Sequence, residues 1–204
     1  KSVFCVNFCK DNQRVVKHLS KPPPKHFISS QMDRLIFLVG FMGSGKSYWG
    51  ARLAEKTGVP YFDLDKLIEA RASSTIPRIF ELAGEDGFRS LERETLHDCD
   101  QFDTAIVATG GGTPCFFDNM AWMNDVGSTI YLKTPATVLA SRLKQEMHLR
   151  PLLANVTPQN LELHIEKLLL QREPFYTQAT ITIQYNADGT AFEELLLNLL
   201  DGLQ

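Results

Sequence analysis

Short apolar stretches alternate with longer helix-like stretches along this chain. The first, residues 35–39, is wholly apolar, as expected of a strand buried inside a sheet. The predicted strands are residues 35–39, 59–63, 104–109, 128–132 and 180–183. Because helices separate them, the pattern predicts one domain built on a parallel sheet with helices on both faces.

Helices are predicted between and after these strands, at residues 48–56, 67–72, 77–83, 84–99, 114–124, 135–145, 158–178 and 191–200. Pro135 suits a first helical turn, whereas Pro174 is expected to interrupt the long helix 158–178. The polar stretch 146–156 lacks periodicity, and a loop of this size inside a compact domain is often a lid. A lid is therefore predicted near residues 146–157.

The turn between the first strand and the first helix carries the strongest chemical signal. Residues 40–47, Gly-Phe-Met-Gly-Ser-Gly-Lys-Ser, have the G-x-x-x-x-G-K-S spacing of a phosphate-binding P-loop. Glycines permit a tight turn lined with amides, and the helix N-terminus adds a positive dipole end. Lys46 supplies a cation for the phosphates, and the Ser47 hydroxyl can bind Mg²⁺. The alternative is a glycine-rich turn that binds no ligand. It would not explain the Lys-Ser pair or the predicted strand and helix on either side of the turn.

Two aspartates follow the second predicted strand. Asp63 and Asp65 are two residues apart, so in extended backbone they share a face. Mg²⁺ bound to a nucleotide needs one or two carboxylates at most, which leaves the other free to accept a proton from a substrate hydroxyl. Solvated turn residues are the alternative, but the position next to the P-loop strand favours the functional interpretation.

Arg89 and Glu92 are three residues apart on one face of the predicted helix 84–99. Such a pair is often an ordinary surface ion pair. An anionic substrate would give it a function, because Arg offers a planar fork that Glu92 could hold in place. The triple glycine at residues 110–112 could likewise be a flexible turn, or could bring bare backbone amides to a ligand.

Two further arginines are candidates for contacts with anions. Arg150 lies in the predicted lid and could reach a transferring phosphate, and Arg172 could clamp a second anionic group. Each of them, taken alone, is better explained as a solvated side chain.

Charge is unevenly distributed along the 204 residues. Residues 1–31 hold six Lys or Arg and one Asp, whereas the rest of the chain holds fifteen basic and twenty-three acidic residues. An acidic body disfavours nucleic-acid binding, and no apolar run is long enough to cross a membrane. The four cysteines and five histidines have no metal-ligand spacing, and reduced thiols are expected.

Residues 1–31 are not predicted to belong to the folded domain, which is assigned to residues 32–204. They include the proline run 22–24, which favours an extended backbone. A transit peptide, a disordered tail and an extension ahead of a start at Met32 are the alternatives, of which a dispensable tail is favoured. The body suits the cytoplasm, or a plastid if the tail is a transit peptide.

Together these motifs resemble the shikimate kinase family across residues 34–200. They are the P-loop, Phe-Asp-Leu-Asp (62–65), Phe-Arg-x-x-Glu (88–92), Gly-Gly-Gly (110–112), Leu-Arg-Pro-Leu-Leu (149–153) and Arg-x-Pro-x-Tyr (172–176), in family order. The resemblance implies a monomeric three-layer α/β/α sandwich whose five-stranded parallel sheet has the order 2-3-1-4-5, with a mobile lid. It also implies transfer of the ATP γ-phosphate to the 3-hydroxyl of shikimate, on the route to chorismate and the aromatic amino acids.

The resemblance further implies roles on the nucleotide side. ATP would be bound by Gly43, Ser44, Gly45, Lys46, Ser47, Tyr48, Arg142 and Arg150. Ser47 and Asp63 would hold Mg²⁺, Asp63 through water, and Lys46 and Arg150 would act on the transferring phosphate. In many relatives a residue near a proline after the last strand covers adenine. Residues 186–189 contain no proline, so the adenine contacts stay open.

On the substrate side, the resemblance implies that Asp65 binds the shikimate hydroxyls and acts as the base. The other implied shikimate contacts are Arg89, Glu92, Gly111, Gly112 and Arg172. Another small-molecule P-loop kinase, such as a gluconate kinase, is the alternative, but it has no need of two arginines for a ring carboxylate. A kinase-like protein without activity would be expected to lack Lys46, an aspartate or Arg150, and all are present.

Overall fold

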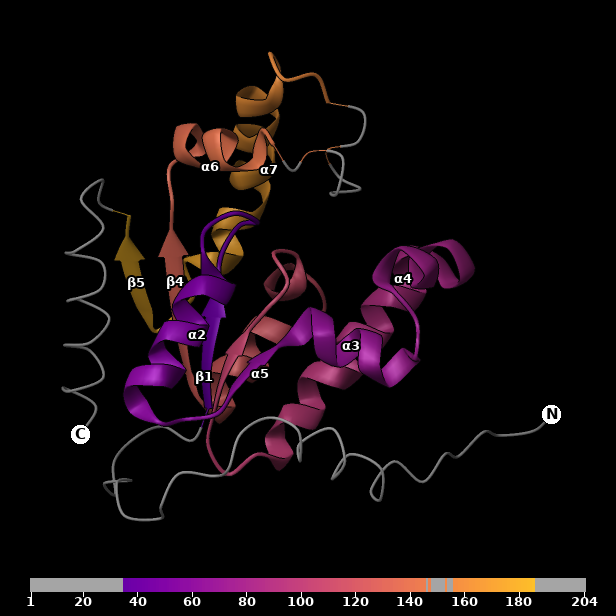
Figure 1. Cartoon of the computed structure of the whole chain (residues 1–204), viewed down its shortest axis with the longest axis vertical. Coiled ribbons are helices and arrows are strands. Elements are labelled where there is room, and N and C mark those ends of the chain that lie inside the picture. Colours follow the sequence, from indigo (N-terminus) through magenta and orange to yellow (C-terminus); the bar gives the residue numbers. More distant parts are fainter. Residues whose placement is uncertain (1–34, 146, 148–152, 154–155, 186–204) are drawn as a thin grey trace. The chain divides into compact units, whose positions relative to one another are not determined.

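The computed structural model describes residues 35–145, 147, 153 and 156–185. Within these residues, a five-stranded parallel sheet has the order β2-β3-β1-β4-β5 (Figure 1). Its strands are β1 (Leu35–Val39), β2 (Tyr61–Asp63), β3 (Ala105–Ala108), β4 (Ser128–Lys133) and β5 (Ile181–Gln184). The predicted strands, their parallel direction and their order are therefore confirmed.

The described residues also form six α-helices and two 3-10 turns. The helices are α2 (Lys46–Thr57), α3 (Leu64–Ala72), α4 (Ile76–His97), α5 (Asn119–Val126), α6 (Ala136–Leu143) and α7 (Leu161–Tyr176). The 3-10 turns are η1 (Asp98–Gln101) and η2 (Thr113–Cys115). Gly84, with φ of 69°, interrupts α4 at the boundary predicted between two helices.

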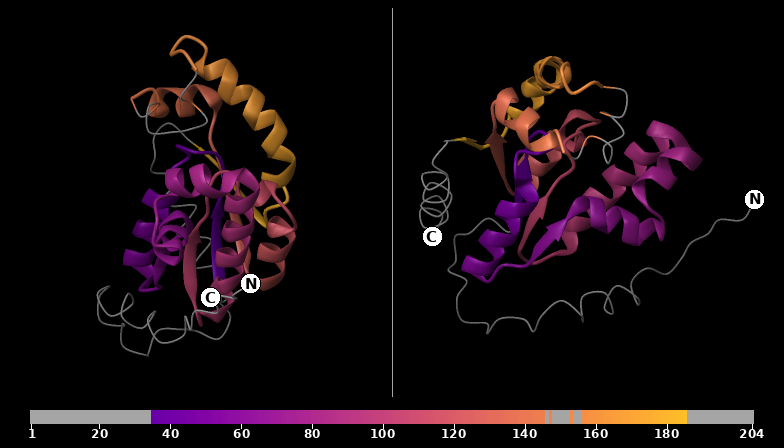
Figure 2. Two further views of the ribbon diagram at one scale, coloured as in Figure 1. Left: turned by 90° about the vertical axis from the view of Figure 1, so that its right-hand side faces the viewer. Right: turned by 45° about the horizontal axis from the view of Figure 1, so that its top comes forward.

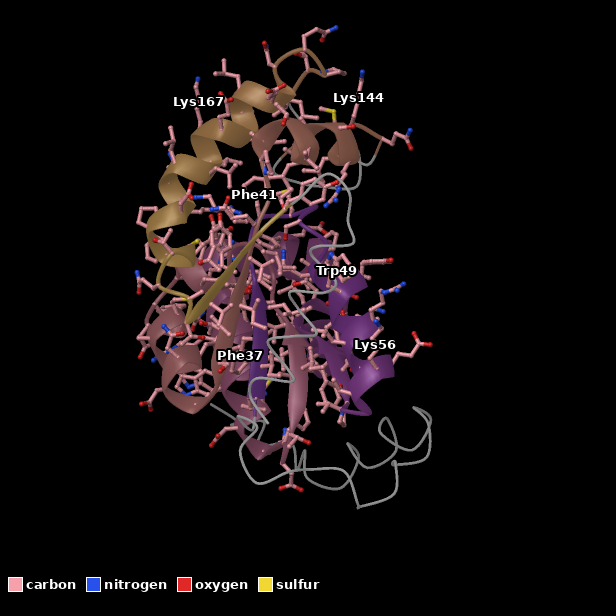
Figure 3. The ribbon with its side chains drawn as sticks, turned by 90° about the vertical axis from the view of Figure 1, so that its left-hand side faces the viewer. Phe37, Phe41, Trp49, Lys56, Lys144 and Lys167 are labelled. Carbon is pink, nitrogen blue, oxygen red and sulfur yellow. The ribbon has the colours of Figure 1, made fainter. Side chains whose placement is uncertain are left out.

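Alternate residues of β1 point to opposite faces of the sheet. Leu35 and Phe37 join a cluster built with residues of α3 to α7, whereas Ile36 and Leu38 pack with Leu53 of α2. Figure 2 shows α2 and α7 on opposite sides of the sheet, and Figure 3 shows the side chains between them. Helices on both faces leave the carboxyl ends of the strands as the open edge where ligands bind in such folds.

Two predictions about helices are wrong. Pro174 does not interrupt α7, because it lies in the last turn, and the N–H of Thr177 still donates to Glu173 O at 2.9 Å. Residues 114–124 do not form one helix either. Phe116 is extended and Phe117 has φ of 51°, so the chain leaves η2 and starts a new helix at Asn119.

Several predictions concern residues outside the described ranges. They include the tail at 1–31, the helix at 191–200, Arg150 and most of the lid near 146–157. In the part of the chain that the structure describes, no helix is long and apolar enough to cross a membrane.

Candidate active site

The P-loop connects β1 to α2 and has the backbone that its glycines permit. Gly43 and Gly45 have φ of 78° and 97°, values that side-chain-bearing residues rarely adopt. The N–H of Ser44 donates to Phe41 O at 3.1 Å and closes the turn. Gly45 then caps α2, so the helix N-terminus opens directly onto the loop.

Lys46 begins α2 and bends back over the loop. Its buried Nζ donates to Gly40 O at 2.8 Å and Phe41 O at 2.9 Å. The ammonium is therefore held by carbonyls of the loop itself. Phosphate oxygens entering the loop can take over these acceptor positions, because an ammonium prefers anionic oxygens to neutral carbonyls.

A cavity of about 630 Å³ opens beside the loop. Nine of the predicted residues line it: Gly43, Gly45, Lys46, Ser47, Tyr48, Asp63, Asp65, Gly111 and Arg142. Of the predicted residues that the structure describes, Ser44, Arg89, Glu92, Gly112 and Arg172 do not line it, and Arg150 lies outside the described ranges. Ser44 is buried, and its hydroxyl has no hydrogen-bond partner among the residues that the structure describes.

Asp63 ends β2 and accepts hydrogen bonds from three directions. Its Oδ2 accepts from the Ser47 hydroxyl at 2.9 Å and the Tyr61 hydroxyl at 3.3 Å, and its Oδ1 accepts from the N–H of Asp65 at 3.1 Å. Burial and the nearby Asp63 carboxylate raise the pKa of Tyr61 to about 12, so its hydroxyl stays a donor. These bonds fix Asp63 opposite the first turn of α2.

Asp65 lies in the first turn of α3, where the cavity meets a second group of charged residues. A Cβ placed on Gly110 would lie 3.1 Å from both Asp65 Oδ1 and Glu92 Oε1. The bare Gly110 backbone therefore separates two carboxylates from different helices, and a side chain there would press against both.

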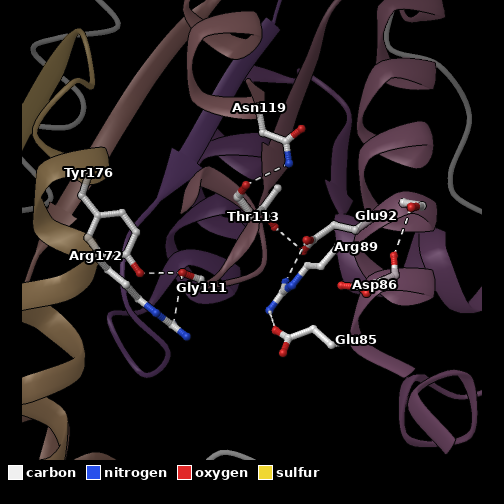
Figure 4. Close-up of polar contacts among 10 residues, drawn as sticks. Glu85, Asp86, Arg89, Glu92, Gly111, Thr113, Asn119, Arg172 and Tyr176 are labelled. Carbon is white, nitrogen blue, oxygen red and sulfur yellow. Dashed lines mark hydrogen bonds and ion pairs between the residues drawn. The ribbon is translucent and has the colours of Figure 1, made fainter. Parts of the chain in front are cut away.

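Arg89 is the centre of that second group (Figure 4). Its buried guanidinium donates from Nη1 to Glu92 Oε2 at 2.8 Å and from Nη2 to the exposed Glu85 at 3.3 Å. The guanidinium carbon lies 3.9 Å from the ring centroid of Phe116, and the buried Nε has no partner within the described part of the chain. A buried arginine donor with no acceptor favours a site for an anion.

Arg172 and Tyr176 of α7 both reach the carbonyl of Gly111, at 3.4 Å from Nη1 and 2.5 Å from the hydroxyl (Figure 4). Burial raises the pKa of Tyr176, so the hydroxyl remains a donor. Burial also raises the pKa of Cys115 to about 11, although Arg172 and Arg89 act to lower it. The Cys115 thiol is therefore protonated at neutral pH.

Tyr185 is a candidate that the sequence did not single out. It follows β5, its N–H donates to Lys133 O at 2.8 Å, and its ring centroid lies 4.8 Å from the guanidinium carbon of Arg142. Arg142 Nη1 also donates to Gly43 O at 2.9 Å. An aromatic ring directly after the last strand of a parallel sheet was the signal that could have indicated it.

Thr113, Phe116, Asn119 and Tyr176 were also missed as site residues. The first three follow the triple glycine at the carboxyl end of β3, within or next to the stretch predicted as one regular helix. Tyr176 belongs to the motif that contains Arg172, and its spacing of four residues on a helix was the available signal.

Comparison with known proteins identifies the family of the chain. The sequence profile of the shikimate kinase family matches residues 42–203. The shikimate kinase of Parabacteroides distasonis is 45% identical over 147 residues, which cover 72% of this chain and 85% of that protein. The shikimate kinase of Phocaeicola vulgatus is 46% identical over 144 residues, which cover 71% and 82%.

Solved structures agree with the sequence comparison. The crystal structure of shikimate kinase from Bacteroides thetaiotaomicron has a TM-score of 0.75 and 39% identity, and the match covers 82% of this chain and 98% of that one. Shikimate kinase from Acinetobacter baumannii in complex with shikimate has a TM-score of 0.74 and 34% identity, covering 84% and 96%. With the P-loop cavity and the arginine cluster beside it, these matches show that the chain belongs to the shikimate kinase family.

Proposed function

We propose that this chain transfers the γ-phosphate of ATP to the 3-hydroxyl of shikimate and thus acts in the pathway to chorismate. One observation supports this above the others: a P-loop cavity and a buried arginine cluster meet at Asp65 and Gly110. A phosphate donor and a carboxylated acceptor could therefore lie on either side of one carboxylate.

The nucleotide side of the proposal rests on the loop and α2. Gly43, Gly45 and the backbone of Ser44 would surround the phosphates, and Lys46 would contact the group being transferred. Tyr48 and Arg142 line the same cavity, and Arg150, outside the described residues, would act from the lid. For Ser44 the contact would be made by its backbone, since its side chain is buried.

Mg²⁺ fits the oxygen atoms of Ser47 and Asp63. Two neighbouring ligands of an octahedral Mg²⁺ at about 2.1 Å lie roughly 3 Å apart. The Ser47 Oγ to Asp63 Oδ2 distance is 2.9 Å, so both could bind the ion directly, or Asp63 through water. No group of three His, Cys, Asp or Glu that could hold a metal occurs among the described residues, which suits an ion that also needs phosphate oxygens. When bound, Mg²⁺ would neutralise charge on the phosphates.

On the acceptor side, Arg89 and Arg172 would hold the shikimate carboxylate. The buried Nε of Arg89 and its contact with Phe116 support a planar, fixed donor. Glu92 would orient Arg89, and Gly111 and Gly112 would allow close approach. A Cβ on Gly112 would lie 2.8 Å from both terminal nitrogens of Arg89, so a larger residue there would displace the guanidinium.

Asp65 would accept the proton of the 3-hydroxyl as its oxygen attacks phosphorus. Positioning and electrostatic stabilisation carry most of the acceleration in phosphoryl transfer. The chain supplies both through Lys46 and the loop amides on one side and the arginines on the other.

One experiment tests the function. ADP release by the full chain with Mg²⁺-ATP is measured by a coupled assay with shikimate, with gluconate and without an acceptor. We expect rapid release with shikimate only. Release with gluconate and not shikimate would favour the alternative kinase.

We predict that Tyr185→Ala raises the KM for ATP. The ring would flank the adenine together with Arg142, and stacking of a base on an aromatic ring contributes about 1–3 kcal/mol, which corresponds to roughly a tenfold rise or more. The KM for shikimate should stay within about twofold. Steady-state kinetics with each substrate varied in turn measure both values.

Tyr185→Phe is the matched control, because it keeps the ring and removes only the hydroxyl. Its KM for ATP should stay close to that of the wild type. Equal effects of the two substitutions, or a parallel rise in the shikimate KM, would remove Tyr185 from the base site.

We also propose that residues 32–204 form the kinase domain and that residues 1–31 are dispensable. The family match begins at residue 42, which supports this division. Deletion of residues 1–31 should leave kcat and both KM values within about twofold, in the range of ordinary surface changes. Loss of activity or a large fall in the unfolding temperature would contradict it.

The cytoplasmic location and the monomeric state belong to the same proposal. Relatives with this family name come from bacteria such as Parabacteroides distasonis, which supports the cytoplasm, while a plastid stays the alternative if residues 1–31 direct import. Sedimentation of the purified chain would determine its oligomeric state.

A further inference from the structure

A line of buried hydrogen bonds runs behind Arg89 (Figure 4). Asn119 Nδ2 donates to Thr113 O at 2.9 Å, and the Thr113 hydroxyl donates to Glu92 Oε1 at 2.6 Å. The other oxygen of Glu92 accepts from Arg89 Nη1 at 2.8 Å. Thr113 and Asn119 are fully buried, and Glu92 is 1% exposed.

Glu92 depends on this line for its position. A buried carboxylate is stable only when both oxygens are paired, and here one oxygen is paired with Arg89 and the other with Thr113. With only one partner the carboxylate could rotate about that bond. Because Glu92 is the buried acidic partner of Arg89, its rotation would move the guanidinium.

Thr113 is itself held in place at the start of η2. Its N–H donates to Gly110 O at 3.2 Å, while its carbonyl is held by Asn119. Its Oγ1 would lie 3.0 Å from a Cβ on Gly110, the position that Asp65 and Glu92 approach from other sides. The hydroxyl is therefore aimed at Glu92 by backbone contacts on both sides of the residue.

We propose that Thr113, held by Asn119, is a positioning residue that fixes Glu92 and thereby orients the Arg89 guanidinium toward the carboxylate of the substrate. This rests on the proposed function, in which Arg89 binds that carboxylate. Thr113 does not itself touch the substrate. Small errors in the position of a binding group have large effects, and partners behind binding groups often contribute 10-fold or more to affinity.

Thr113→Val tests the role of the hydroxyl, since it preserves shape and removes the donor. We expect the KM for shikimate to rise about tenfold, the size of effect typical when a partner behind a binding group is removed, with the KM for ATP within about twofold. Calorimetric titration of shikimate should show the same loss of affinity. Thr113→Ser, which restores the donor, should return the shikimate KM to within about threefold of the wild type.

Thr95→Val is the matched control on the same helix as Arg89 and Glu92. Thr95 is also buried, but its hydroxyl donates to Leu91 O at 2.8 Å within α4. The control should leave the shikimate KM unchanged, and thermal unfolding of both variants measures any general loss of stability. If Thr113→Val does not fold, Thr113→Ala supports the same comparison.

Comparison with the methyl ester of shikimate distinguishes a change in the orientation of Arg89 from a general loss of substrate binding. The ester lacks the charged carboxylate, so its binding should be weak and nearly equal in the wild type and in Thr113→Val. Equal losses for acid and ester, an unchanged shikimate KM, or no recovery in Thr113→Ser would each overturn the proposal.

If the wild type neither binds nor phosphorylates shikimate, the proposed function fails and this proposal with it. If the wild type is active and Thr113→Val matches it, only this proposal fails.

Discussion

Asp65→Asn is expected to lower kcat for phosphorylation of shikimate by about 10³-fold, since a positioned general base contributes roughly 10² to 10⁴. Asparagine has the size of aspartate and keeps one acceptor oxygen, but it cannot take the proton of the attacking hydroxyl. Asp65 borders both the cavity and the Gly110 backbone. Because asparagine fills the same space, the substitution removes the base with little disturbance of these neighbours.

ATP binding should separate a chemical role for Asp65 from a structural one. Calorimetric titration with ATP should give a dissociation constant within about threefold of the wild type. The proposed role of Asp65 is to take a proton in the transition state, so its loss should not weaken the binding of ATP. The exposed Asp125 of α5 provides a control, and Asp125→Asn should leave kcat unchanged. Equal losses of ATP affinity and turnover would show that Asp65 supports the loop structure instead.

Arg89→Ala is expected to raise the KM for shikimate by about 100-fold. A hydrogen bond to a charged group contributes about 1.5–3 kcal/mol, and a bidentate pair contributes more than one such bond. The KM for ATP should change far less. Removal of the guanidinium also leaves Glu92 as a buried carboxylate with Thr113 as its one remaining partner among the described residues, so a loss of stability should accompany the kinetic effect.

Two substitutions distinguish binding from stability in this case. Arg89→Lys keeps a positive charge near Glu92 but lacks the planar fork, so it should recover stability more fully than shikimate binding. Arg93→Ala, one turn along α4, removes a half-buried arginine paired with Asp118 at 2.8 Å and should leave both KM values unchanged. An unchanged shikimate KM in Arg89→Ala would exclude Arg89 from the site.

The predictable part of the molecule is the part encoded by short-range rules. The P-loop could be predicted because glycine positions, a lysine and a strand–helix transition all lie within residues 35–57. Asp63 and Asp65 could be placed beside it because parallel strands end at one edge of the sheet. The pairing of Arg89 with Glu92 follows from their spacing on a helix, and the structure has it at 2.8 Å.

The missed residues depend on contacts between distant segments. Phe116 lies against Arg89 because the chain turns at Phe117, whereas a regular helix from residue 114 would send Thr113 and Phe116 elsewhere. Tyr185 meets Arg142 only because β5 pairs with β4 at one particular register. Pro174 stays helical because it lies in the last turn, where a kink caused by its ring displaces little of the helix. No short stretch of the sequence indicates these contacts and turns.

The ion pair between Arg89 and the exposed Glu85 has a consequence for selectivity. Glu85 already supplies a carboxylate to Arg89 Nη2 at 3.3 Å, so an arriving carboxylate that pairs with this nitrogen exchanges with one that is tethered to the same helix. A tethered competitor of this kind acts at a local concentration of about millimolar or higher. Simple monocarboxylates below that level would not displace it, and only a ligand with further contacts at Gly111 or Arg172 would gain enough to do so.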